Sequence, residues 1–193
     1  MNKAYKLLIV FVILICSCSS SNNIILGRKD SDKPVVLRMN AKQKVITVIE
    51  LPFILRVQNT SIFKKEFGQI IYEYGFKEKG AGIFLYENDN KITNNQLKSV
   101  GLKGSLQYLV YSGHFTDFTE FTQQQLKPYV TKMLELNQDT LHIGTVAEFR
   151  ERHGELFKML TENDTISIRY LKGKNSGLGE RIAIPANFAC YCK

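Results

Sequence analysis

Two cysteines near the C-terminus, Cys190 and Cys192, carry the most reactive side chains of the globular part of the chain. In an oxidising compartment two thiols this close tend to pair, and a bridge across one intervening residue is strained and easily reduced. Three interpretations stay open: a local disulfide, thiols that are free or linked to another chain, and a redox or soft-metal site. The third needs a partner ligand that the sequence does not show, so we assign no metal and no other cofactor.

A serine and a lysine three residues apart, Ser61 and Lys64, form an SxxK pair. This spacing resembles the motif of penicillin-binding proteins and serine β-lactamases, in which the lysine amine activates or orients the serine. Tyr86-Glu-Asn88 also mimics the second motif of these enzymes. A third, KTG-like element is missing, and about 175 mature residues are few for that fold, so we assign Ser61 no catalytic role.

The three histidines could act as bases or metal ligands, but none has the sequence neighbours that such a role needs. His153 and Glu155 resemble the HxE motif of zinc deaminases, although the C-terminal cysteines lack the CxxC spacing of that family. Because His153 follows Phe149 by four residues on an apolar helix face, we expect a packed, hydrogen-bonded core histidine. His114 and His142 are also expected to be structural, so the sequence contains no credible catalytic set.

The first 17 residues have the organisation of a signal peptide. A short basic region with Lys3 and Lys6 precedes an unbroken apolar run over residues 7–16. Ten helical residues reach about 15 Å, roughly half of the ~30 Å hydrocarbon core of a membrane. The run therefore predicts the apolar region of a signal peptide and not a membrane-spanning helix.

The residues that end this segment, Ile15-Cys16-Ser17-Cys18, resemble the lipobox of bacterial lipoproteins. The resemblance implies that the Cys18 thiolate receives a diacylglyceryl group and that Cys18 becomes the first residue after cleavage. Cys16 fits worse, because Ile15 is too bulky for the small-residue position before the cleavage site. Several acyl chains, each CH₂ contributing about 0.8 kcal/mol, make release from the membrane very slow. Ser19, where some lipoproteins have Asp, favours the outer membrane if the host has one.

The composition is that of an ordinary globular chain with one domain, since 44% of its 193 residues are hydrophobic and 23% are charged. Removing Lys3 and Lys6 with the signal peptide leaves 24 basic residues against 18 acidic ones, a net charge of +6. Export, and the lack of basic residues interleaved with aromatic ones, argue against a nucleic-acid partner. Four lysine pairs form solvated basic faces or, less favoured, contact anionic lipid headgroups: Lys42/Lys44, Lys64/Lys65, Lys77/Lys79 and Lys172/Lys174.

The mature chain divides into a tether over residues 18–33, mostly small and polar, and a single globular domain over residues 34–193. Within the tether, an apolar triplet at residues 24–26 could dock on the domain. Segments rich in Val, Ile, Phe and Tyr and bounded by turn residues predict five strands, over residues 34–40, 44–59, 68–75, 82–87 and 105–112.

Alternation of apolar and polar residues is clearest after Glu50, where Pro52 is expected at a bend, a bulge or a sheet edge. One face of this strand is shared by Leu51, Phe53, Leu55 and Val57. We therefore expect a mainly β fold of the α+β class. Its antiparallel sandwich should loosely resemble immunoglobulin-like domains.

The second half of the chain is mixed. Residues 122–137 have a helical apolar face, although Pro128 should delay the start of the helix or break it. Thr145 and Glu148 form a capping-box pattern, and the apolar spacing after it predicts one helix to about Thr161. Alternation then predicts a hairpin over residues 166–184, whose glycine-rich segment 173–179 is a flexible turn and not a phosphate loop.

These features together predict an exported protein of the bacterial cell envelope, anchored to the membrane through lipid on Cys18. The absence of a credible catalytic set favours a binding or assembly module with an envelope protein as its partner. A toxin-neutralising, immunity-type inhibitor falls within this class. The alternative is a small periplasmic thiol-redox or hydrolytic enzyme that uses Cys190, Cys192 or a histidine.

Overall fold

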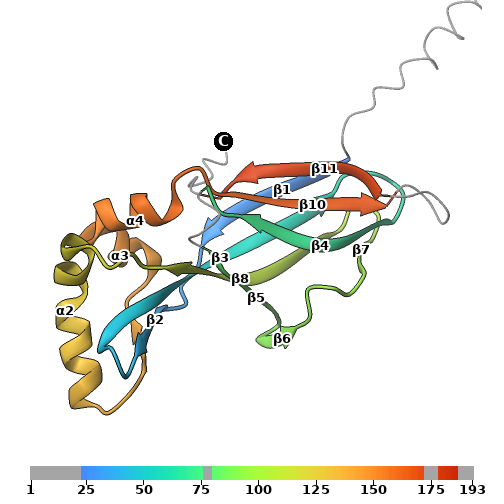
Figure 1. Ribbon diagram of the computed structural model, residues 1–193. Coiled ribbons are helices and arrows are strands. Elements are labelled where there is room, and N and C mark those ends of the chain that lie inside the picture. Colours follow the sequence, from blue (N-terminus) through green and yellow to red (C-terminus); the bar gives the residue numbers. More distant parts are fainter. Residues whose placement is uncertain (1–22, 76–79, 172–177, 187–193) are drawn as a thin grey trace, which may run out of the picture.

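The computed structural model describes residues 23–75, 80–171 and 178–186, which form two antiparallel sheets and three helices (Figure 1). The larger sheet contains β1 (Ile24–Asp30), β2 (Val35–Asn40), β3 (Val45–Asn59), β5 (Gly80–Glu87), β6 (Asn90–Ile92), β8 (Ser105–Phe115) and β9 (Thr140–Ile143). The smaller sheet contains β4 (Lys65–Glu73), β7 (Lys98–Val100), β10 (Thr165–Leu171) and β11 (Leu178–Pro185). The helices are α2 (Glu120–Glu135), α3 (Val146–Arg152) and α4 (Gly154–Thr161). This architecture confirms the expected mainly β, α+β fold.

Strand β3 runs through the middle of the larger sheet, whose order is β6-β5-β8-β3-β2-β9 with β1 also paired to β3. Its pairing with β2 ends at Glu50 and its pairing with β1 begins at Phe53. Pro52 therefore lies where β3 has a strand neighbour only on the β8 side. A residue without an amide proton is tolerated at this local edge, as the sequence predicted.

One continuous inner face of the larger sheet carries two hydrophobic clusters. The inward residues of β3 are all buried and alternate as expected: Ile49, Leu51, Phe53, Leu55 and Val57. Residues up to Leu51 pack with the helices, whereas residues from Phe53 onward pack with the smaller sheet. The fold is thus a two-sheet sandwich at one end and a sheet covered by helices at the other (Figure 1).

Strand β1 corrects the boundary predicted between tether and domain. Residues 24–30, assigned to the tether, pair with the second half of β3, and Ile24 and Leu26 are buried in the core. Their apolar run is short and lies between polar residues, so its composition resembles a linker. Pairing with a strand about thirty residues away decides its structure. The globular domain therefore begins close to Ile24 and not at Pro34.

Helix α2 passes through Pro128 without a break, which differs from the sequence expectation. Proline removes the hydrogen bond to the carbonyl four residues earlier, that of Gln124. Both residues lie at exposed positions, where water can replace the lost bond. Buried Leu126 and Met133 hold the apolar side of the helix against the sheet.

The predicted helix from Thr145 to Thr161 is two helices. The capping box of Thr145 and Glu148 is present at the start of α3, as the sequence predicted. At His153 the backbone leaves the helical region, with φ −130° and ψ 44°, and α4 begins at the next residue. Beyond these helices, β10 and β11 form the predicted hairpin, whose connecting residues 172–177 lie outside the described part.

Candidate functional site

Of the residues singled out in the sequence, Cys18, Cys190 and Cys192 lie outside the described part of the chain. The structure therefore places neither the lipid site nor the thiol pair. Within the described residues, no group of three His, Cys, Asp or Glu side chains is arranged to hold a metal ion. In the same ranges, no helix combines the length and apolar character needed to cross a membrane.

The SxxK pair lies in the connection after β3 and has no catalytic geometry. Ser61 is buried, and its hydroxyl lies 2.7 Å from Asn59 Oδ1 and 2.8 Å from Phe63 O. Lys64 instead forms an ion pair with Glu66, with 2.9 Å between Nζ and Oε1. The hydroxyl and the amine thus have different partners.

His153 lies half-buried between α3 and α4 and uses both ring nitrogens, as a structural histidine does. Its Nδ1 is 2.9 Å from Gln125 Oε1, and its Nε2 is 2.8 Å from the Tyr129 hydroxyl. Since the amide oxygen only accepts, Nδ1 carries the proton and Nε2 accepts from Tyr129. Burial and, to a smaller extent, Arg152 lower the pKa of His153, which favours this neutral ring. The hydrogen bonds fix the break between α3 and α4 against α2.

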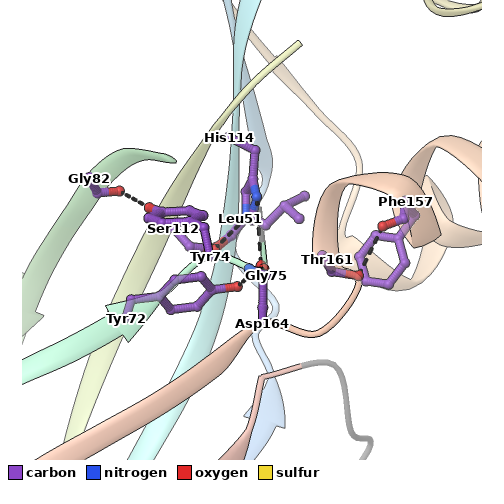
Figure 2. Close-up of polar contacts among 10 residues, drawn as sticks. All are labelled: Leu51, Tyr72, Tyr74, Gly75, Gly82, Ser112, His114, Phe157, Thr161 and Asp164. Atoms are coloured by element: carbon purple, nitrogen blue, oxygen red, sulfur yellow. Dashed lines mark hydrogen bonds and ion pairs between the residues drawn. The ribbon is translucent and has the colours of Figure 1, made fainter. Parts of the chain in front are cut away.

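His114 lies at the centre of a buried polar cluster at the boundary between the two hydrophobic clusters (Figure 2). Along β8 the inward positions change from Tyr108 and Val110 to Ser112 and His114. Three more side chains join them: Tyr72 in β4, Tyr74 just after β4, and Asp164 after α4. We call these five residues, Tyr72, Tyr74, Ser112, His114 and Asp164, the junction network.

Asp164 connects most of the junction network. Its Oδ2 accepts a 2.7 Å hydrogen bond from the Tyr72 hydroxyl, and its Oδ1 accepts one of 2.7 Å from the Gly75 amide. His114 Nδ1 lies 3.8 Å from Oδ2 of the same carboxylate, while its Nε2 is 3.0 Å from Ser112 Oγ. Glycine is needed at residue 75, because a Cβ there would lie 2.0 Å from the Glu162 carbonyl oxygen.

Ser112, His114 and Asp164 lie next to one another in space as in a hydrolytic triad, in which a histidine lies between a serine and a carboxylate. Their surroundings exclude that chemistry in this conformation. Ser112 is 1% exposed and His114 is 0% exposed. The rings of Tyr72 and Tyr74 pack edge-on against the imidazole, at centroid distances of 5.9 and 5.2 Å. A substrate carbonyl cannot reach Oγ, so the arrangement is structural.

The two tyrosines of the junction network act as hydrogen-bond donors. Burial and the Asp164 carboxylate raise the pKa of both Tyr72 and Tyr74 well above the ordinary value, so both hydroxyls stay protonated. Tyr74 donates a 2.7 Å hydrogen bond to the Gly82 carbonyl of β5. The network therefore joins both sheets to the connection between α4 and β10.

One buried and two partly exposed charged side chains extend this polar boundary to β1 and α3. Arg28 is buried, with its guanidinium 4.9 Å from the centre of the Phe53 ring and 3.5 Å from Asp30. Asp30 also accepts a 2.7 Å hydrogen bond from Arg150. These contacts fix the end of β1 to the helical end of the molecule.

An accessible candidate site lies on the outer face of the larger sheet. A pocket of about 320 Å³ is lined by Lys33, Val36, Arg38, Glu50, Tyr86, Asp89, Leu109, Tyr111, Thr140 and His142. It shares Lys33, Tyr86, Asp89 and Leu109 with a neighbouring pocket of about 210 Å³. It also shares Thr140 and His142 with a pocket of about 720 Å³ beside the end of α2. We call these three pockets, which share lining residues, the outer groove.

Side chains of the outer groove offer both donors and an acceptor. Glu50 is 5% exposed and accepts a 2.5 Å hydrogen bond from Nε of the half-exposed Arg38. This hydrogen bond raises the pKa of Arg38, so the guanidinium stays charged. Tyr86 and Tyr111 meet edge to face with their ring centroids 5.9 Å apart, and burial raises the pKa of Tyr111. The groove therefore presents an accessible cation, anchored by a buried carboxylate, beside two phenols.

Sequence reasoning did not find the outer groove, because its side chains come from five strands separated by long stretches of chain. His142, expected to be structural, is exposed and lines it. The one available signal is that Arg38, Glu50 and Tyr111 alternate with buried neighbours on their strands. For the junction network, the signal is a pair of polar residues, Ser112 and His114, on an otherwise apolar face.

Comparison with known proteins adds no relative, since no family model, curated protein or solved structure matches this chain. Function must therefore be argued from the two clusters themselves. The junction network has reactive groups without access, whereas the outer groove is lined by accessible charged and aromatic side chains.

Proposed function

We propose that this chain is a lipid-anchored protein of the bacterial cell envelope that binds an envelope protein through its outer groove without catalysis. One observation carries the proposal: accessible charged and aromatic side chains gather in the groove, whereas the serine, histidine and carboxylate that could do chemistry are buried. Ser19 extends the proposal to the outer membrane where the host has one.

The chemistry of the outer groove supports a protein partner. Tyrosine and arginine are the residues that most often dominate binding energy at protein interfaces, because each combines a large apolar surface with polar groups. Arg38, half-exposed and anchored by the buried Glu50 carboxylate, can bind a partner carboxylate or carbonyl. An exposed ion pair between Lys33 and Asp89, 3.1 Å long, lies at the same groove and can rearrange on binding.

The anchor is tested by replacing Cys18 with alanine. Because only a cysteine thiolate can take the diacylglyceryl thioether, Cys18→Ala is expected to abolish lipid labelling and to leave a precursor that retains the signal peptide. Labelling with an alkyne fatty acid and the intact mass of the purified chain measure both effects. Cys16→Ala is the matched control and should be labelled and processed normally. Normal labelling of Cys18→Ala would contradict the proposal.

The groove is tested by chemical crosslinking of the anchored protein in its own membrane, with partners identified by mass spectrometry. Tyr111→Ala and Arg38→Ala are each expected to weaken the affinity for the partner about thirty-fold, and capture should fall accordingly. This is the effect of losing a central interface residue that contributes ~2 kcal/mol. Arg56→Ala, an exposed arginine on the same strand as Glu50, is the matched control and should capture normally.

Circular dichroism confirms that each groove variant is folded before its capture is compared. Equal capture by all three variants would show that the partner binds elsewhere and would overturn the groove assignment. Capture of no protein above the Cys18→Ala control would move the proposal toward a small ligand or an enzymatic role.

A further inference from the structure

The end of the sandwich opposite the helices carries exposed apolar side chains. Ile62 and Phe63, in the connection between β3 and β4, are 62% and 68% exposed, and Leu102, in the turn between β7 and β8, is 66% exposed. The two segments are adjacent, because the Lys103 amide donates a 2.9 Å hydrogen bond to the Ser61 carbonyl. We call Ile62, Phe63 and Leu102 the apolar tip.

Buried polar contacts hold the apolar tip in shape. The side-chain amide of Asn59, a fully buried residue, donates to the Phe63 carbonyl at 2.7 Å and to the Gly101 carbonyl at 2.8 Å. Its Oδ1 accepts a 3.0 Å hydrogen bond from the Ser61 amide. One side chain thus fixes both segments, and the apolar side chains point outward from a well-connected base.

Lysines surround the apolar tip. Lys64 and Lys103 are exposed, and the half-buried Lys65 has its Nζ 5.9 Å from the centre of the Tyr170 ring. One acidic residue, Glu66, pairs with Lys64. Apolar side chains beside an excess of lysine are the combination that binds the interface of an anionic bilayer. The apolar side chains enter the headgroup region, and the lysines contact the lipid phosphates.

The chain enters the fold at the apolar tip. The Thr60 amide donates a 2.8 Å hydrogen bond to the Asn23 carbonyl, and Ile24 pairs with Asn59. Asn23 follows Cys18 by five residues, which span at most about 18 Å when fully extended. A lipid on Cys18 would therefore keep Asn23, and with it the end of the sandwich that carries the apolar tip, close to the membrane surface.

We propose that the apolar tip is a membrane-docking surface, with Ile62, Phe63 and Leu102 in the headgroup region and the neighbouring lysines on anionic lipid. This inference rests on the proposed lipid anchor, which supplies the proximity. In this orientation the long axis of β3 points away from the bilayer, and α2, α3 and α4 lie farthest from the membrane (Figure 1). The outer groove then stays accessible to a partner along the side of the sheet.

The test uses the absence of tryptophan from the sequence. Phe63→Trp places a single indole at the apolar tip of the lipidated protein, purified from its own membranes and reconstituted in phosphatidylethanolamine and phosphatidylglycerol vesicles. Its emission is expected to shift to shorter wavelength and to be quenched by brominated lipid. Phe118→Trp, at a site of 65% exposure in the connection before α2, is the matched control and should emit as in water.

Adding Ile62→Ser and Leu102→Ser to the Phe63→Trp protein should reduce the quenching severalfold, and replacing the anionic vesicles with phosphatidylcholine vesicles should do the same. If intact mass shows lipid on Cys18 while the indole at residue 63 is quenched no more than the one at residue 118, the docking inference is wrong and the anchor stands. If Cys18 carries no lipid, the anchor is wrong, and the docking inference is tested separately by adding the same vesicles to the unlipidated protein. Quenching of the indole at residue 63 would then support membrane docking by the apolar tip, and no quenching would overturn it.

Discussion

Replacing Asp164 with alanine is expected to lower the free energy of unfolding by about 2–6 kcal/mol, because two donors lose their buried acceptor at about 1–3 kcal/mol each. The substitution leaves the Tyr72 hydroxyl and the Gly75 amide without the carboxylate that accepts from both. It also removes the negative charge 3.8 Å from His114 Nδ1. Urea unfolding followed by circular dichroism measures the change.

Two controls separate the network from a general effect of substitution. Tyr72→Phe removes one hydrogen bond of the same carboxylate and is expected to cost about 1 kcal/mol. Asp32→Ala, at an exposed aspartate, should stay within about 0.5 kcal/mol of the parent. A change below about 1 kcal/mol for Asp164→Ala would mean that water or a rearranged neighbour replaces the carboxylate, and the structural role would be wrong.

The same network decides between binding and hydrolysis. Since Ser112 is 1% exposed and two tyrosine rings pack against its neighbour His114, Ser112→Ala should leave partner capture unchanged, and a fluorophosphonate probe should leave the folded protein unlabelled. Labelling at Ser112 would show that the cluster opens in solution. It would revive the hydrolytic alternative, which the buried geometry disfavours.

The sequence predicted the features that depend on local spacing. Alternation along β3, the capping box at Thr145 and the hairpin of β10 and β11 all depend on residues within about twenty positions of one another. Pairing of β1 with β3 and the long α2 through Pro128 depend on distant partners and were missed for that reason. Short strands such as β6 and β7 have too few residues to show any periodicity.

The candidate sites differ in the same way: one is a local sequence motif, and the others are assembled from residues far apart in the chain. Cys18 was assigned from four adjacent residues, whereas the outer groove gathers side chains from Lys33 to His142 and has no local pattern. The apolar tip is intermediate. The lysine pair at residues 64 and 65 was noted in the sequence, but its meaning changes once the fold places Leu102 and the start of β1 beside it.

Phe53→Ala is the second substitution with a large expected cost, about 3–5 kcal/mol, since a buried aromatic ring is replaced by a cavity. Phe53 lies on the inner face of β3, where its pairing with β1 begins, and its ring centre is 6.1 Å from that of Tyr72. Its face also covers the buried guanidinium of Arg28 at 4.9 Å. Phe53→Leu keeps most of the apolar volume and should cost less, while Ile25→Ala at an exposed site of β1 should cost little.

Combining Phe53→Ala with Asp164→Ala tests whether the two hydrophobic clusters fold as one unit. Both side chains contact Tyr72, so the two changes should be non-additive by about 0.5–3 kcal/mol, as for residues that share a partner. Because β3 runs through both clusters, each variant should unfold in a single transition. Two separate transitions would mean that the sandwich and the helical end unfold independently, and strict additivity would mean that Tyr72 does not couple the two side chains.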